Sequence, residues 1–280
     1  MARKIKIGAL ISGGGTNLQS IIDASESGEI DAEIRFVGSD NPEASGLARA
    51  KRHGIDAFVV DYREIIKKYK KDPGSFQTPG DFNHGDVLSK WALFPLSQDQ
   101  KTDGNEDRKE RMAAFIATRV AAEAMLLEKM GAYSVDLIVL AGFMRNFTPY
   151  FIDRVNGDES LPRIMNIHPA LLPSFPGVDG YGDTFEYGCK VGGCTVHFVD
   201  YGEDSGPVIG QKAFSILPGD RLEDVRKKGL ELEWALYPEC IQLYAEGRLK
   251  VTKRRRESRD GQKKRRSIVE MIPATQKQRG

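Results

Sequence analysis

Two polar residues with complementary chemistry, Asn166 and His168, lie two positions apart in the run Asn-Ile-His-Pro-Ala-Leu-Leu-Pro at 166–173. Residues at this spacing in a strand project from the same face of a sheet. An amide can donate hydrogen bonds to a developing oxyanion, and an imidazole can exchange a proton near neutral pH. A lone histidine is more often a structural residue, but the partner amide and the proline-stiffened exit favour a catalytic function here.

A glycine-rich loop, Ser-Gly-Gly-Gly-Thr-Asn at 12–17, follows a strand expected over Lys4–Leu10. Glycines allow close backbone approach, and the free amides at the start of the next helix suit a phosphate group. The loop is not a Walker loop, because no Gly-Lys-Ser/Thr follows. Leu18 stands where a dinucleotide fingerprint has its third glycine. Asp40, after the second expected strand, could serve as the acid that binds the ribose of a dinucleotide, so a dinucleotide site remains an alternative. The other alternative is that the loop is only a tight turn.

A third segment, Asp-Tyr-Gly-Glu-Asp-Ser-Gly-Pro at 200–207, is an acidic loop between two expected strands. Taken alone, it is most simply a solvated turn. It would matter for catalysis if one of its carboxylates approached His168 and oriented the imidazole ring.

These motifs are connected by alternating strand and helix patterns, which predict an α/β fold with a Rossmann-like, mostly parallel sheet and helices on both faces. The expected strands are Lys4–Leu10, Ile34–Gly38, Ala57–Val60, Val135–Ala141, Ile164–Ile167, Thr195–Val199 and Val208–Phe214. The expected helices follow the glycine loop and span Ala44–His53, Tyr62–Lys70, Glu110–Met130 and Asp220–Gly247.

The domain predicted over 1–247 contains an insertion at 72–107, which we expect to be partly packed with a mobile end at 97–107. A basic tail follows at 248–280. It carries 13 Lys and Arg against 3 Asp and Glu, although the whole chain is nearly balanced at 41 against 40. Few apolar residues interrupt its basic blocks, which predicts a flexible or weakly helical tail. Such a tail is either a solvated extension or a non-specific nucleic-acid contact.

Composition narrows the class of protein. Three cysteines without Cys-x-x-Cys spacing predict neither a disulfide framework nor a metal site, and favour a cytoplasmic location. No apolar run is long enough for a membrane helix, and the first residues do not resemble a signal peptide. We therefore expect no membrane partner. The sequence leaves open a homodimer.

The motifs together resemble the folate-dependent formyltransferase superfamily. The resemblance rests on the loop at 12–17, Ala-Gly-Phe-Met-Arg at 141–145, the run at 166–173 and the stretch at 195–209. Asn-x-His-Pro with a downstream Asp-x-Gly-Pro is typical of the superfamily, and Gly-Gly-Thr-Asn points within it to the glycinamide ribonucleotide formyltransferases. The resemblance covers residues 4–71 and 108–250.

The resemblance implies the formyltransferase fold and transfer of the formyl group of 10-formyltetrahydrofolate to the amine of glycinamide ribonucleotide, in de novo purine biosynthesis. Asn166 and His168 would stabilise a tetrahedral intermediate, with Asp204 assisting proton transfer. The implied substrate-binding residues are Gly14, Gly15, Thr16, Asn17 and Glu233. The implied folate-binding residues are Arg111, with Arg108 as its alternative, and Met144, Arg145, Asn146, Phe147 and Asn166.

Two departures from the family pattern bear on these expectations. Residues 180–185 replace a segment that usually carries histidine and arginine, and the insertion at 72–107, which could be a lid or an oligomer contact, has no usual counterpart. The related tRNA enzyme would need a further C-terminal domain, and the formyl-folate hydrolase an N-terminal one. A non-catalytic nucleotide or nucleic-acid binder is the alternative of a different class.

Overall fold

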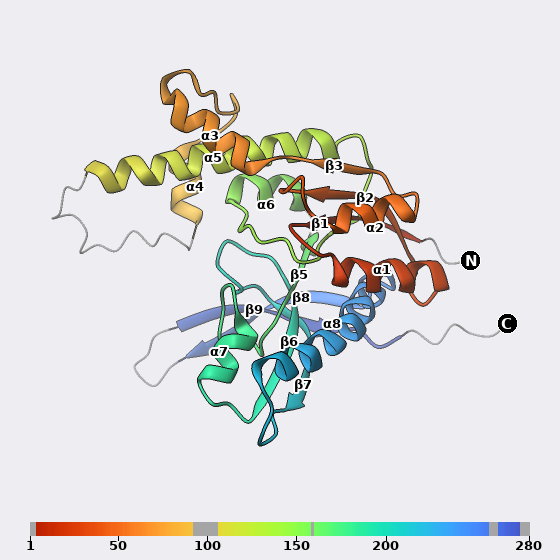
Figure 1. The fold of residues 1–280 in the computed structure, drawn as a ribbon. Coiled ribbons are helices and arrows are strands. Elements are labelled where there is room, and N and C mark those ends of the chain that lie inside the picture. Colours follow the sequence, from red (N-terminus) through yellow and green to blue (C-terminus); the bar gives the residue numbers. More distant parts are fainter. Residues whose placement is uncertain (1–3, 92–105, 158–159, 258–262, 275–280) are drawn as a thin grey trace.

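The computed structural model describes residues 4–91, 106–157, 160–257 and 263–274, without the side chains of residues 106–109, 256, 257, 263 and 264. A central sheet lies between layers of helices, with a separate two-stranded ribbon on one side (Figure 1).

The central sheet has seven strands in the order β3-β2-β1-β4-β5-β6-β7. The strands are β1 (Ile5–Ile11), β2 (Ala32–Ser39), β3 (Ala57–Val59), β4 (Leu137–Leu140), β5 (Ile164–His168), β6 (Val191–Phe198) and β7 (Val208–Ser215). Pairing is parallel from β3 to β5 and antiparallel from β5 to β7. The predicted mostly parallel sheet is confirmed. The strand order reverses beside β1, and such a switch point opens a crevice at the carboxyl ends of the strands.

Helices cover both faces of the sheet, as predicted. One apolar cluster joins α1 (Thr16–Ser27), α2 (Gly46–Arg52) and α8 (Leu222–Ala245) to the strands. The other cluster joins α3 (Tyr62–Lys71), α5 (Glu106–Met130) and α6 (Pro149–Asn156) to the opposite face. Helices α6 and α7 (Gly180–Glu186) were not predicted from the sequence, because helices of one or two turns contain too few apolar repeats to be recognised.

Helix α8 is fixed to the centre of the sheet by a buried tyrosine. The hydroxyl of Tyr237 donates to the carbonyl oxygens of Met165 at 2.8 Å and Leu140 at 3.2 Å. Tyr237 is fully buried, so both strand carbonyls would lose a partner if it moved. The helix therefore holds Glu233, one turn earlier, at a defined distance from the ends of β4 and β5.

The described part of the insertion is ordered, as expected. After α3 come a short 3₁₀ helix at Pro73–Ser75 and α4 (His84–Lys90). Trp91 is only 2% exposed and stacks on Phe115 of α5, with ring centroids 5.9 Å apart. The mobile end expected at 97–107 lies outside the described residues, apart from the backbone of residues 106 and 107 at the start of α5. Within the described parts of the chain, no helix is both long and apolar enough to cross a membrane.

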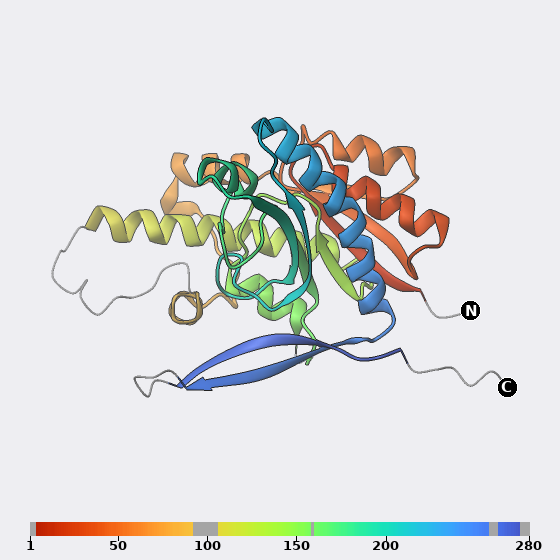
Figure 2. The same cartoon turned by 90° about the horizontal axis from the view of Figure 1, so that it is seen from below.

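The expectation of a flexible or weakly helical tail is wrong. Strands β8 (Leu249–Glu257) and β9 (Lys263–Met271) form an antiparallel ribbon, which follows α8 and runs along one side of the molecule in Figure 2. Leu249 is buried, and Val251 and Val269 pack against the main core. These three apolar residues anchor the base of the ribbon, because alternate positions of a strand face the same side. The strands were not predicted from the sequence because these few apolar residues lie among runs of Lys and Arg.

Candidate active site

A cavity of about 350 Å³ lies at the carboxyl ends of β4 and β5 and brings most of the predicted site residues together. The predicted residues that line it are Asn17, Met144, Arg145, Asn146, Asn166, His168, Asp204 and Glu233. Next to it, a smaller cavity of about 50 Å³ is lined by Phe147 and His197 among others. Apart from Arg111, the remaining predicted residues, Gly14, Gly15 and Thr16, belong to the glycine loop beside Asn17.

The glycine loop and the segment after β4 meet at the switch point of the sheet. The Ser12 amide donates to the Gly142 carbonyl at 3.0 Å, and the Met144 amide donates to the Ser12 hydroxyl at 2.8 Å. Parallel pairing of β1 with β4 puts both loops at the same edge. Two segments more than a hundred residues apart in sequence therefore form one wall.

The imidazole of His168 is almost fully buried, with 3% exposed, and lies between two hydrogen-bond acceptors. Its Nε2 is 2.7 Å from the carbonyl oxygen of Phe175, and its Nδ1 is 3.2 Å from Oδ2 of Asp204. A carbonyl and a carboxylate can only accept, so both ring nitrogens must donate to satisfy them. The arrangement therefore suits an imidazolium paired with a carboxylate.

His197 is a site residue that the sequence analysis missed. It pairs directly with Asn166 across β5 and β6. Its Nδ1 is 2.9 Å from the carbonyl oxygen of Phe198, and its Nε2 is 3.2 Å from Nδ2 of Asn166. The amide of Asn166 has two hydrogens, so the contact with His197 leaves at least one of them for a ligand. Only the strand register, which the sequence did not provide, brings these residues together.

The acidic loop at 200–207 is not a solvated turn, because it delivers Asp204 to both histidines. Besides His168, Asp204 approaches Nε2 of His197 at 3.6 Å and accepts from the Gly177 amide at 2.9 Å. Burial acts to raise the pKa of Asp204. The His197 contact, the charge of His168 and the Gly177 amide together outweigh burial and lower the pKa below its usual range. Asp204 is therefore a carboxylate at neutral pH.

The loop has its own internal order. The carboxylate of Asp200 accepts from the Gly202 amide at 3.0 Å and from the Ser205 hydroxyl at 2.6 Å. Asp204 itself has a φ of +46°, a left-handed conformation that aspartate tolerates better than most residues. Gly206 packs so closely that an added Cβ would lie 1.8 Å from the Phe198 carbonyl oxygen. These features set the direction of the Asp204 carboxylate.

The glycine loop presents the start of α1 to solvent without a side-chain cap. Gly15 precedes the helix with a φ of +68°, and an added Cβ there would meet the Gly46 Cα at 3.0 Å. Gly14 and Thr16 are exposed. Uncapped amides at a helix start form a suitable site for an anion such as phosphate.

A buried chain of three side chains links this loop to α7 and α8. Nδ2 of Asn17 donates to Glu233 at 2.7 Å, and the Tyr181 hydroxyl donates to the other Glu233 oxygen at 2.7 Å. Burial raises the pKa of Glu233, although both hydrogen bonds act to lower it. Oδ1 of Asn17 is buried and has no partner among the described residues. Because Asn17 lines the cavity, this oxygen indicates a place for a ligand donor. Tyr181 belongs to the segment that departs from the family pattern.

The segment Met144 to Phe147 combines exposed and buried positions. Met144 is 58% exposed, whereas Phe147 is 3% exposed and stacks on Phe151, with centroids 3.9 Å apart. Nε of Arg145 donates to Oδ2 of Asp40 at 2.6 Å. Asp40 is 2% exposed, so its carboxylate is covered and cannot reach a bound ribose. A dinucleotide site would therefore lack the acidic residue that binds its ribose.

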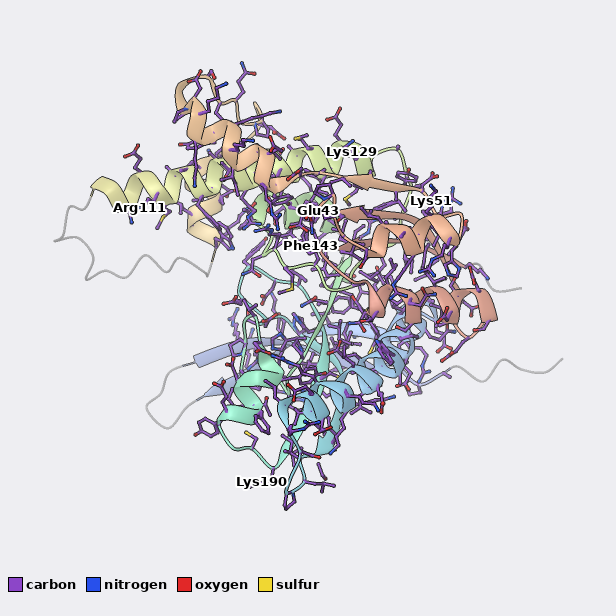
Figure 3. All side chains as sticks on the ribbon, viewed as in Figure 1. Glu43, Lys51, Arg111, Lys129, Phe143 and Lys190 are labelled. Carbon is purple, nitrogen blue, oxygen red and sulfur yellow. The ribbon has the colours of Figure 1, made fainter. Side chains whose placement is uncertain are left out.

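Arg111 is not near the cavity. It is exposed and lies toward the outer end of α5, away from Phe143 of the cavity wall (Figure 3), and the Arg108 side chain is outside the described residues. Of the two α5 arginines whose side chains are described, Arg119 is the one that packs inward. It lies 5.3 Å above the ring of Tyr62, which Arg145 contacts at 5.5 Å. The sequence shows several arginines on this helix, but only the docking of the helix decides which one packs against Tyr62.

Among the described residues, no group of three or more His, Cys, Asp or Glu side chains could hold a metal ion. The three cysteines are free thiols, of which Cys194 and Cys240 are buried. Burial raises the pKa of both buried thiols to about 12. Cys194 and Cys240 are therefore packing residues.

Comparison with known proteins identifies relatives along almost the whole chain. The formyl transferase family model matches residues 5–241. The phosphoribosylglycinamide formyltransferase of Haemophilus influenzae is 34% identical, with 88% of this chain and 90% of the relative covered. Its namesake from Bacillus subtilis is 31% identical, with 84% and 92% covered. The structure of glycinamide ribonucleotide transformylase 1 from Symbiobacterium toebii superposes with a TM-score of 0.67 at 34% identity, covering 97% of this chain and 96% of that one.

Coverage of this extent, together with the Asn166, His168 and Asp204 geometry, leads to a single assignment. The chain belongs to the formyl transferase family, with the phosphoribosylglycinamide formyltransferases.

Proposed function

We propose that the protein transfers the formyl group of 10-formyltetrahydrofolate to the primary amine of glycinamide ribonucleotide. The observation that supports this most directly is the His168–Asp204 pair, with Asn166 beside it, in a cavity that Asn17 and Glu233 also line. Asn166, His168 and Asp204 are thus placed to catalyse acyl transfer. Asn17 and Glu233 are placed to bind a ribose phosphate that carries an amine.

Asn166 and His168 act on the oxygen of the formyl group. Attack by the amine turns the formyl carbonyl into an oxyanion, which the free amide hydrogen of Asn166 and the charged His168 stabilise. The reaction must also carry one proton from the amine to the folate nitrogen. The charged His168 donates a proton to the folate nitrogen and takes up the proton of the amine in return, and the ionised Asp204 orients the ring through Nδ1.

The remaining predicted residues bind the two substrates. The amides of Gly14 to Asn17 meet the phosphate, and Glu233 with Oδ1 of Asn17 meets the ribose hydroxyls or the amine. The segment from Met144 to Phe147 and the apolar Val178 border the space for the folate ring system. The cavity is lined by both polar and apolar side chains, which fits an amphipathic heterocycle.

The test mixes the protein, glycinamide ribonucleotide and a 10-formyl-folate analogue, and follows loss of the formyl group by absorbance. We expect turnover that requires both substrates and is nearly abolished in Asn166→Ala, His168→Ala and Asp204→Ala, each with an unchanged circular dichroism spectrum. Folded protein without turnover, or a His168→Ala variant at full rate, would overturn the proposal. Deformylation without the ribonucleotide would instead indicate a hydrolase.

A further inference from the structure

The ribbon of β8 and β9 has a charge arrangement that the enzyme site does not explain. Its two strands contain nine Lys and Arg residues and two Glu. The register places Arg254 directly opposite Arg266, and Arg255 directly opposite Arg265. All four arginines are exposed. Because adjacent residues of a strand face opposite sides, one pair lies on each face of the ribbon.

These opposed arginines are not neutralised within the described parts of the chain. No described carboxylate forms an ion pair with any of the four, and Glu270 accepts from the Thr252 hydroxyl instead. Like charges directly opposite each other destabilise a strand pair. The distal half of the ribbon therefore concentrates positive charge at a cost, which a polyanion would relieve.

The excess of positive charge is confined to the C-terminal segment that contains the ribbon. Residues 1–247 carry 28 basic and 37 acidic residues, whereas residues 248–280 carry 13 and 3. The ribbon is anchored by Leu249, Val251 and Val269 at its base, and its arginines follow toward the other end. Figure 2 shows the ribbon along one side of the molecule, where it follows directly from the end of α8. No residue of the ribbon lines either cavity of the site.

Two features narrow the type of polyanion. Arginines on both faces suit a groove that encloses the ribbon, whereas a flat anionic membrane would meet one face only. The two strands contain no Phe, Tyr or Trp, so the ribbon lacks the stacking platform that single-stranded nucleic acids use. The major groove of duplex DNA admits a two-stranded β-ribbon and has phosphates along both borders.

We infer that the β8–β9 ribbon binds double-helical DNA, through contacts of Arg254, Arg255, Arg265 and Arg266 with the phosphates. The contact is independent of base sequence, because phosphate contacts carry no sequence information. It is a second interaction surface, beyond the proposed formyl transfer.

The experiment measures fluorescence anisotropy of a labelled DNA duplex titrated with the full chain, at a series of salt concentrations. Four phosphate contacts give a slope of log affinity against log salt of about −3.6. A fourfold rise in salt should then weaken binding about 10²-fold. Arg254→Gln with Arg266→Gln, and separately Arg255→Gln with Arg265→Gln, should each reduce the slope by about 1.8.

The matched control is Lys51→Gln with Lys129→Gln, which removes the same charge from two exposed positions of the body, labelled in Figure 3. It should leave the slope unchanged. Arg→Lys at the four ribbon positions should retain most of the binding, because each phosphate contact depends on the charge. Unchanged formyl transfer in every variant confirms the fold.

Three results would overturn the inference. The first is equal duplex affinity in the control and both ribbon variants. The second is binding to single-stranded DNA, or to vesicles of anionic phospholipid, that is as tight as binding to the duplex and depends on the same arginines. The third is self-association by sedimentation velocity that the ribbon variants abolish, since the partner would then be a second copy of the chain.

Discussion

Replacing Asp204 by asparagine tests the central pair of the proposed mechanism, because it removes one negative charge and almost no volume. In the wild type, Oδ2 of Asp204 faces Nδ1 of His168 at 3.2 Å and accepts from the Gly177 amide at 2.9 Å. The asparagine variant has a single acceptor oxygen. If it stays with the Gly177 amide and His168, the contact with His168 loses its charge; if it turns, an NH₂ group faces the Nδ1 donor.

The expected loss follows from these contacts. A hydrogen bond to a charged group contributes about 1.5–3 kcal/mol, which corresponds to a rate factor on the order of 10–10². Loss of a correctly protonated donor costs about 10²–10⁴ in rate. Both effects act through His168 and are not additive. We therefore expect kcat to fall by about 10²–10⁴. KM should change little, because Asp204 does not contact the residues proposed to hold the ribonucleotide.

The assay is steady-state kinetics with both substrates, with Glu203→Gln as the control. Glu203 is a neighbouring carboxylate that lines the cavity but accepts from Asn146 at 3.3 Å, not from a histidine. We expect this control to change kcat only a few-fold. A folded Asp204→Asn variant with kcat within tenfold of the wild type, or no slower than the control, would refute the assignment of Asp204.

The same substitution has a pH signature. The folded-state pKa of Asp204 is lowered, so its ionisation stabilises the fold above the ordinary carboxyl pKa, and this stability is lost as pH falls through the folded pKa. The free energy of unfolding by urea should thus differ between wild type and variant at pH 7, and the difference should shrink in acid. A difference that grows as pH falls would contradict this reasoning.

Three further substitutions have expected outcomes. Tyr181→Phe removes one of two hydrogen bonds to Glu233, so KM for the ribonucleotide should rise about tenfold or more at constant kcat in steady-state kinetics. Gly206→Ala forces a Cβ against the Phe198 carbonyl oxygen; activity should fall, and urea unfolding should show a loss of about 1–3 kcal/mol. Burial raises the pKa of Glu123 to about 8, so wild-type stability should decline from pH 5 to 8, and Glu123→Gln should show a smaller decline in urea unfolding across that range.

Much of the fold was predictable because its signals are local. Continuous apolar runs separated by helical repeats indicated the strands and the principal helices on both faces of the sheet. The two-residue spacing of Asn166 and His168 indicated a shared face, and both residues do line one cavity. Ser12 to Asn17 were recognised from glycines that permit a positive φ, which Gly15 has.

Other features depended on contacts that are remote in sequence. His197 reaches Asn166 only through the antiparallel register of β5 and β6. Arg119, rather than Arg111, faces inward because of the way α5 docks on the sheet. The ribbon of β8 and β9 forms despite its charge, since three apolar residues at its base pack against the core.

The sequence by itself determined the strands of the central sheet and its longer helices, the glycine loop and the chemical types of the catalytic groups. These follow from residue periodicity and side-chain chemistry along short stretches. Only the tertiary structure decided the ionisation and direction of those groups. From the sequence alone, Asp204 is expected to be a solvated loop carboxylate. In the structure, strand pairing brings it to His168 and His197, where burial and the two imidazoles set its pKa. Electrostatic interactions depend on distance in space, which the linear sequence does not specify.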